Sequence, residues 1–124
     1  LGTHPVLQAM REVMGPWAVN TAGCQIGREA LLDTAWRDSM RLRLTHQTQI
    51  LRHILHDAGL SFVGGTLFFS LWRTAHAQEI WERLAQAGIL VRRFAWDETL
   101  LRFGLPADEA ALTRLTQALA SPAS

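Results

Sequence analysis

Apolar residues recur at helical spacing through the first half of the chain. The first such pattern begins after Thr3-His4-Pro5, ends at Gly15-Pro16, and includes Val6, Met10, Val13 and Met14. A longer pattern runs from about residue 22 to residue 57, and Gly59 is suited to end it. Because this segment is longer than a typical globular helix, we expect a break near Asp33–Asp38.

The spacing of apolar residues changes to two after Gly59, which predicts strands. The expected strands are Ser61–Val63, Leu67–Trp72, Ile89–Phe94 and Leu100–Gly104, with Gly64-Gly65 as the turn between the first two. Helices are expected at Ala75–Ala87 and from Asp108 onward. The predicted fold is therefore α+β: long N-terminal helices, then β-β-α-β-β-α, with the helices packed mainly on one face of a small sheet.

The segment Gly15–Asn20 (GPWAVN) is the candidate boundary within the chain. Residues 1–19 are expected to form a connecting helix and crossover. Residues 20–120 are expected to form one compact domain, and residues 121–124 a frayed tail.

Composition narrows the functional classes. The 124 residues are 48% hydrophobic and 19% charged, as in a folded globular domain. No apolar run suits a membrane span and no N-terminal segment resembles a secretory signal. The single cysteine, Cys24, excludes an internal disulfide, so we expect a cytoplasmic protein. A net charge of +1 gives no support for a nucleic-acid partner.

Two residue types are absent. The chain has no tyrosine, and all 12 basic residues other than histidine are arginine, so no lysine amine is present. Covalent catalysis through a lysine is therefore impossible within this chain. The chain also begins at Leu1 rather than Met, which favours a processed product or a part of a longer protein.

Candidates for metal or nucleophilic chemistry are weak. His46, His53 and His56 share a helix face, followed by Asp57, but no paired cysteines or HExxH motif accompany them, so we expect no metal site. Cys24 has no histidine partner nearby and is expected to be packed rather than catalytic. The five tryptophans are expected to pack in the core or an interface rather than to stack on bases.

The arginines of the last two predicted strands carry more information. Side chains alternate along a strand, so Arg92 and Arg93 are expected to point to opposite faces of the sheet. Arg102 lies between Leu101 and Phe103, which should face the core. Arg102 is therefore expected to point away from the core.

Two interpretations of Arg102 remain open at this point. An arginine fork on a rigid strand is suited to bind a carboxylate or phosphate through two hydrogen bonds. The alternative is a structural salt bridge to a helix carboxylate such as Glu82 or Asp108.

The ordered segments PWAVN, VGGTLFFSL, GILVRRF and LRFGLP resemble the carboxy-terminal part of fold-type I pyridoxal-phosphate (PLP) enzymes. The similarity is greatest to the histidinol-phosphate aminotransferase-like group and covers about Pro5 to Leu119. Within that group, the spacing of LVRRF and LRFGLP is similar to the L-threonine-O-3-phosphate decarboxylases of cobalamin biosynthesis.

The resemblance implies that this chain is the small domain of a PLP-dependent decarboxylase or aminotransferase. The family's lysine and cofactor-binding residues lie on a large domain, so this chain is expected to hold no catalytic or cofactor-binding residue. By the same resemblance, Arg102 binds the substrate α-carboxylate and Arg92 lies near the substrate phosphate. Arg93 faces away, and Asn20 marks the crossover between the domains.

The implied partners are a small phosphorylated amino acid, the large domain of the same polypeptide and a second copy in a homodimer. Nucleic acid and membrane are not expected partners. Two other hypotheses stay open: a stand-alone α+β module that binds a small anion, and an interaction module that dimerises through its tryptophans.

The absence of lysine generates the first testable prediction. After incubation with PLP and reduction with borohydride, mass spectrometry of the 124-residue chain should show no adduct on any side chain. A weak adduct at the amino terminus is compatible with this prediction. A stoichiometric side-chain adduct would contradict it.

Overall fold

The computed structural model describes residues 3–120 of the chain. By its internal contacts the chain divides into two compact units, one up to Asp38 and one from Ser39 onward. This division lies inside a helix and not at residues 19 and 20. The predicted role of residues 1–19 as a connection to another domain stays a prediction, and the predicted tail at 121–124 lies outside the described residues.

The first unit contains helices α1 (His4–Met14), α2 (Thr21–Leu32) and the beginning of α3 (Thr34–Asp57). Gly15 ends α1 with a φ of 70°, a conformation that favours glycine. Asn20 caps α2, because its Oδ1 accepts a hydrogen bond from the Gly23 amide at 2.7 Å. Thr3 occupies the N-cap position of α1, but its side chain makes no capping hydrogen bond.

The predicted break in the long helical segment is confirmed at Asp33, between α2 and α3. The Asp33 carboxylate accepts a hydrogen bond from the Trp36 amide at 2.9 Å and so caps α3. The Arg37 guanidinium donates to the Leu31 carbonyl at 2.8 Å, near the end of α2. Each helix end at the break therefore has a polar partner.

The second unit is built on a four-stranded sheet in the order β1-β2-β4-β3. The strands are β1 (Ser61–Gly65), β2 (Phe69–Arg73), β3 (Arg92–Arg93) and β4 (Leu100–Gly104), and every neighbouring pair is antiparallel. The predicted α+β fold is confirmed, and β4 lies between β2 and β3, where it pairs on both sides.

The turn between β1 and β2 differs from the prediction. Gly64 and Gly65 belong to β1, and the turn lies at Thr66–Phe68. The Thr66 hydroxyl accepts hydrogen bonds from the amides of Phe68 and Phe69, at 3.2 and 3.3 Å, so a threonine forms this turn. Gly65 is needed for a close approach, because a Cβ there would lie 2.6 Å from the Phe69 carbonyl oxygen.

The third strand is shorter than the predicted Ile89–Phe94, because only Arg92 and Arg93 pair with β4. The residues before them are bound to helix α4 (Ala77–Gln86) instead. The Ile89 amide donates to the Leu84 carbonyl at 2.8 Å, and the Trp81 indole donates to the Val91 carbonyl at 3.2 Å. These contacts use the backbone groups that a longer strand would need.

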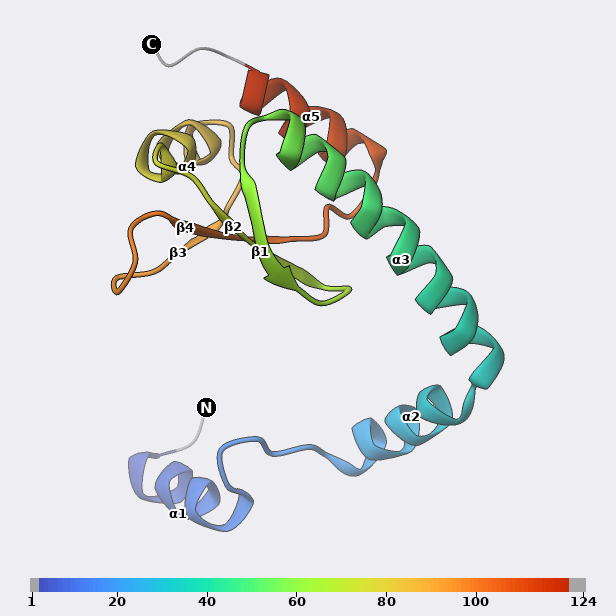
Figure 1. Cartoon of the computed structure of the whole chain (residues 1–124). Coiled ribbons are helices and arrows are strands. Elements are labelled where there is room, and N and C mark those ends of the chain that lie inside the picture. The colour runs from blue at the N-terminus through green and yellow to red at the C-terminus, as the bar shows by residue number, and fades with distance from the viewer. Residues whose placement is uncertain (1–2, 121–124) are drawn as a thin grey trace. The chain divides into compact units, whose positions relative to one another are not determined.

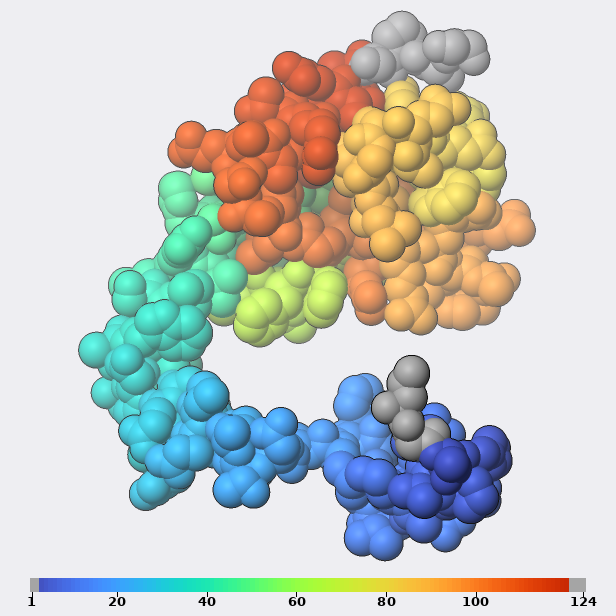
Figure 2. Space-filling view, turned by 180° about the vertical axis from the view of Figure 1, so that it is seen from behind, coloured from blue at the N-terminus to red at the C-terminus, as the bar shows by residue number. Residues whose placement is uncertain are grey.

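One face of the sheet is covered by α4, α5 (Glu109–Ala120) and the C-terminal half of α3, as Figure 1 shows. Figure 2 shows α4 and α5 side by side. The buried core between these helices and the sheet includes Leu51, Leu55, Trp72, Ile80, Leu84, Leu101, Phe103, Leu115 and Leu119. Asp108 caps α5, as predicted, by accepting a hydrogen bond from the Ala111 amide at 2.8 Å.

No helix within residues 3–120 is both long and apolar enough to cross a membrane.

The core position of α3 generates a second prediction. Leu55 is fully buried, so Leu55→Ala should lower the free energy of unfolding by about 2–5 kcal/mol. Leu42→Ala is the matched control on the same helix, where the leucine is exposed, and it should change stability by less than about 0.5 kcal/mol. Urea unfolding monitored by circular dichroism measures both. Equal losses in the two variants would contradict the assigned core.

Candidate functional site

Two arginines lie directly opposite each other on the sheet. Arg92 of β3 and Arg102 of β4 are partners in the antiparallel ladder. Opposed residues point to the same face, with their Cβ atoms about 4.5–5.5 Å apart. The structure therefore brings together the two predicted site residues.

The face on which they lie is settled by their neighbours. Leu101 and Phe103 are 0% and 2% exposed on the helix-covered side, so Arg102 points to the other face, as predicted. Arg93 also follows the prediction, because its guanidinium lies 5.2 Å from the ring centroid of Trp81 on α4. Arg92 and Arg93 thus diverge to opposite faces.

Neither Arg92 nor Arg102 forms an ion pair with a carboxylate among residues 3–120. The alternative salt bridge from Arg102 to Glu82 or Asp108 is absent in this part of the chain. Glu82 accepts a hydrogen bond from the Gln78 side chain, and Asp108 caps α5. Two like charges facing each other across a ladder destabilise the fold, and a bound anion would offset that repulsion.

An aromatic ring accompanies each of these arginines. The Arg102 guanidinium carbon lies 4.6 Å from the ring centroid of Phe69 on β2. The Arg92 guanidinium carbon lies 5.7 Å from the centroid of Phe94. A shallow hollow of about 400 Å³ beside them is lined by Phe69, Leu90, Val91, Arg92, Arg102 and Gly104.

A third arginine on this face forms an ion pair with an aspartate. Arg73, at the end of β2, lies 3.6 Å from the Asp97 carboxylate in the loop between β3 and β4. Hydrogen bonds donated by the Thr99 hydroxyl at 2.6 Å and its amide at 3.0 Å, with the nearby Arg73, hold the pKa of Asp97 below its usual value of 3.8. Asp97 is therefore charged and engaged away from the Arg92–Arg102 pair.

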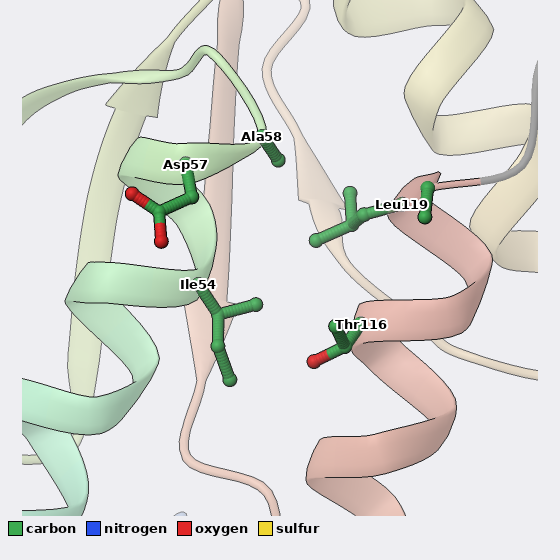
Figure 3. Close-up of a pocket in the computed structure, with 6 residues that line it drawn as sticks. Ile54, Asp57, Ala58, Thr116 and Leu119 are labelled. Carbon is green, nitrogen blue, oxygen red and sulfur yellow. The ribbon is translucent and has the colours of Figure 1, made fainter.

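A different hollow lies between the C-terminal ends of α3 and α5 (Figure 3). Its lining residues are Ile54, Asp57, Ala58, Thr116, Leu119 and Ala120. Asp57 is the one charged residue of this lining, and its carboxylate lies 3.5 Å from the His56 ring. This hollow lacks the convergent polar groups of a binding site for a small anion.

The weaker sequence candidates do not assemble into a site. In the described part of the chain, no three histidine, cysteine or acidic side chains are placed to hold a metal ion. Cys24 is exposed rather than packed, because no residue of α2 is buried. Of the tryptophans, Trp72 is in the core as expected, whereas Trp17 and Trp96 are largely exposed.

Comparison with known proteins places the chain in a family. Residues 1–119 match the family described as aminotransferase class I and II. The chain belongs to this family. The family resemblance expected for Pro5 to Leu119 is thereby confirmed.

Within the aminotransferase class I and II family, two similar proteins are threonine-phosphate decarboxylases. The one from Pseudomonas aeruginosa is 39% identical over 119 residues, which are 96% of this chain and 36% of that protein. The one from Sinorhizobium sp is 36% identical over 120 residues, which are 97% of this chain and 35% of that protein. The chain spans about a third of the length of these relatives.

Solved structures support the small-domain fold of this family. A proposed aminotransferase from Burkholderia pseudomallei superposes with a TM-score of 0.69 at 20% identity, over 93% of this chain and 36% of that one. A proposed histidinol-phosphate aminotransferase from Erwinia carotovora atroseptica gives a TM-score of 0.70 at 18% identity, over 92% and 34%. At these identities the likeness concerns the fold alone.

The sequence did not reveal the aromatic partners of the arginines. Phe68 and Phe69 both fall in the expected strand Leu67–Trp72, but Phe68 lies in the turn and Phe69 begins β2 on the uncovered face, and both are exposed. The available signal was the alternation Phe69, Leu71, Arg73 within β2, opposite to the buried Ser70 and Trp72. The contact with Arg102 needed the register between β2 and β4, which no local pattern encodes.

The depressed pKa of Asp97 generates a third prediction. A carboxyl group whose pKa is lower in the folded state stabilises the fold above its unfolded pKa, and the effect is lost as the pH falls through the folded value. The wild type should therefore be more stable than Asp97→Asn at neutral pH, and the difference should vanish progressively below about pH 4. Urea unfolding over a pH series measures this. A difference that persists unchanged into acid would contradict the role given to the charge.

Proposed function

We propose that this chain is the small domain of a PLP-dependent L-threonine-O-3-phosphate decarboxylase of cobalamin biosynthesis. In this function Arg102 binds the substrate carboxylate and Arg92 binds the substrate phosphate. The observation that carries the proposal is the cross-strand Arg92–Arg102 pair on one face, which no carboxylate of the described residues neutralises. The similarity to threonine-phosphate decarboxylases over nearly the whole chain supports the choice of substrate.

The geometry of the pair suits one ligand with two anionic groups. Neighbouring strands lie about 4.8 Å apart. This spacing is similar to the distance between a carboxylate and a phosphate that are attached to nearby carbon atoms of one molecule. A guanidinium presents its N–H donors in a planar fork that matches both groups. Hydrogen bonds between charged groups are stronger than neutral ones, so each arginine adds affinity as well as orientation.

PLP acts as an electron sink when the carboxylate is lost as carbon dioxide. This chain has no lysine, so it cannot hold the cofactor covalently through a lysine amine. What this chain contributes is the position of the substrate. A guanidinium fixed on a strand orients the carboxylate, and with it the bond that breaks. If this arginine bound the carboxylate more strongly in the substrate than in the transition state, the reaction would slow. The contact therefore has to orient the carboxylate without binding the ground state too strongly.

The proposal also includes partners. The large domain of the same polypeptide would supply the lysine and cover apolar residues of the first unit, where Trp17 is 91% exposed and no residue of α1 or α2 is buried. A homodimer is proposed on the same ground, since exposed apolar patches drive association. Neither nucleic acid nor a membrane is a proposed partner, and the cytoplasm is the proposed location.

An aminotransferase of the histidinol-phosphate type is the alternative, because an arginine for a substrate carboxylate serves both reactions. A stand-alone module that binds a small anion would use the same two arginines. Release of carbon dioxide from L-threonine O-3-phosphate by the PLP-loaded protein distinguishes the decarboxylase from both.

The role of Arg102 generates a fourth prediction. Arg102→Lys keeps the charge but loses the planar fork, which is a large change at a site that binds through two hydrogen bonds. Losing one charged hydrogen bond costs about 1.5–3 kcal/mol. In the PLP-loaded protein that carries this chain, kcat/KM for L-threonine O-3-phosphate should therefore fall by roughly ten- to over a hundredfold.

Arg93→Lys is the matched control, because Arg93 lies on the helix-covered face against Trp81. It should leave kcat/KM nearly unchanged. If Arg93→Lys abolished activity while Arg102→Lys kept it, the assigned site would be wrong.

A further inference from the structure

We propose that Phe69 is a positioning residue, which holds the guanidinium of Arg102 in the orientation that receives a carboxylate. This inference rests on the proposed function of Arg102 and adds a residue to it. The distance of 4.6 Å from the Arg102 guanidinium carbon to the Phe69 ring centroid is that of a cation–π contact.

The sheet register explains why Arg102 lies over this ring. The direct cross-strand partners of Arg102 are Leu71 on β2 and Arg92 on β3. Its diagonal neighbours on β2 are Phe69 and Arg73, which long side chains can reach. Toward Arg73 the Arg102 guanidinium would meet a like charge, whereas toward Phe69 it meets the negative face of an aromatic ring.

Arg73 forms an ion pair with Asp97 at 3.6 Å, so its charge is already neutralised by a partner other than the ligand. Arg73 and Arg102 therefore have separate partners on this face: Arg73 pairs with a carboxylate and Arg102 contacts a ring. The ring is the partner that leaves room for a ligand. The ring is uncharged and offers no carboxylate, so its contact with the guanidinium leaves the planar fork of N–H donors for an anion.

Two features indicate that the Phe69 side chain is not part of the hydrophobic core. Its side chain is 49% exposed, whereas its neighbour Ser70 is buried. Its cross-strand partner is Gly104, and a Cβ at Gly104 would lie 3.7 Å from the ring atom Cε1. The ring thus lies beside a glycine on the uncovered face. The Arg92–Phe94 contact is longer, at 5.7 Å, so the support is stronger for Arg102.

The test compares two ligands by isothermal titration calorimetry in the protein that carries this chain, without PLP so that neither ligand is turned over. One is L-threonine O-3-phosphate, and the other is the amine phosphate that remains when its carboxylate is removed. Phe69→Leu should weaken binding of the first about two- to fivefold, the size of an exposed cation–π contact, and leave binding of the second unchanged. Phe69→Trp should restore binding, because it supplies a ring again.

Phe68→Leu is the matched control, since Phe68 is exposed in the preceding turn and makes no ring contact with either site arginine. It should not change either affinity. Equal effects of Phe68→Leu and Phe69→Leu, or an equal loss for both ligands, would overturn the proposal, because both outcomes indicate a general structural effect.

Two further measurements separate the possible failures. If Arg102→Lys leaves the affinity for L-threonine O-3-phosphate intact, the proposed function fails; if Arg102→Lys weakens it and Phe69→Leu does not, only the positioning role fails. If Phe69→Leu does not fold, Phe69→Ile replaces it, because a β-branched side chain suits a strand and carries no ring. It should weaken binding of the carboxylate-bearing ligand alone, and unchanged binding would overturn the proposal.

Discussion

The alternation of side chains along β4 decides how the rest of the second unit is arranged. Leu101 and Phe103 point into the layer formed by α3, α4 and α5, and Arg102 between them points away from it. A shift of one residue in this strand would place a guanidinium in the apolar core and two apolar side chains outside. Burial of Leu101 and Phe103 therefore fixes the face on which Arg102 lies, and the strand pairing then places Arg92 beside it.

The second constraint is electrostatic. Arg73, Arg92 and Arg102 share the uncovered face, and among residues 3–120 only Arg73 of these three forms an ion pair, with Asp97. Arg92 and Arg102 are left with aromatic partners, which accept a cation without neutralising it. Two like charges opposite each other on a ladder destabilise the fold, and a bound anion would offset this repulsion, which supports the proposed anion site. Because both residues are arginine, the site offers planar forks rather than mobile point charges.

Local patterns in the sequence were sufficient for β4, for the break at Asp33 and for the α+β class, because each depends on residues close together in the chain. Contacts between distant segments were not predictable in the same way. The predicted strand at Ile89–Phe94 was too long, since its first half is bound to α4 by Leu84 and Trp81. The candidate arginines came from alternation and family resemblance, whereas their aromatic partners depend on a register that the chain sets only on folding.

A crystal structure of the protein that carries this chain in complex with L-threonine O-3-phosphate would test the proposed site most directly. We expect the Arg102 guanidinium to donate two hydrogen bonds of about 2.7–2.9 Å to the substrate carboxylate, and Arg92 to bind the phosphate. A complex in which the ligand's anionic groups are bound elsewhere, with Arg92 and Arg102 still facing each other without an anion, would contradict it.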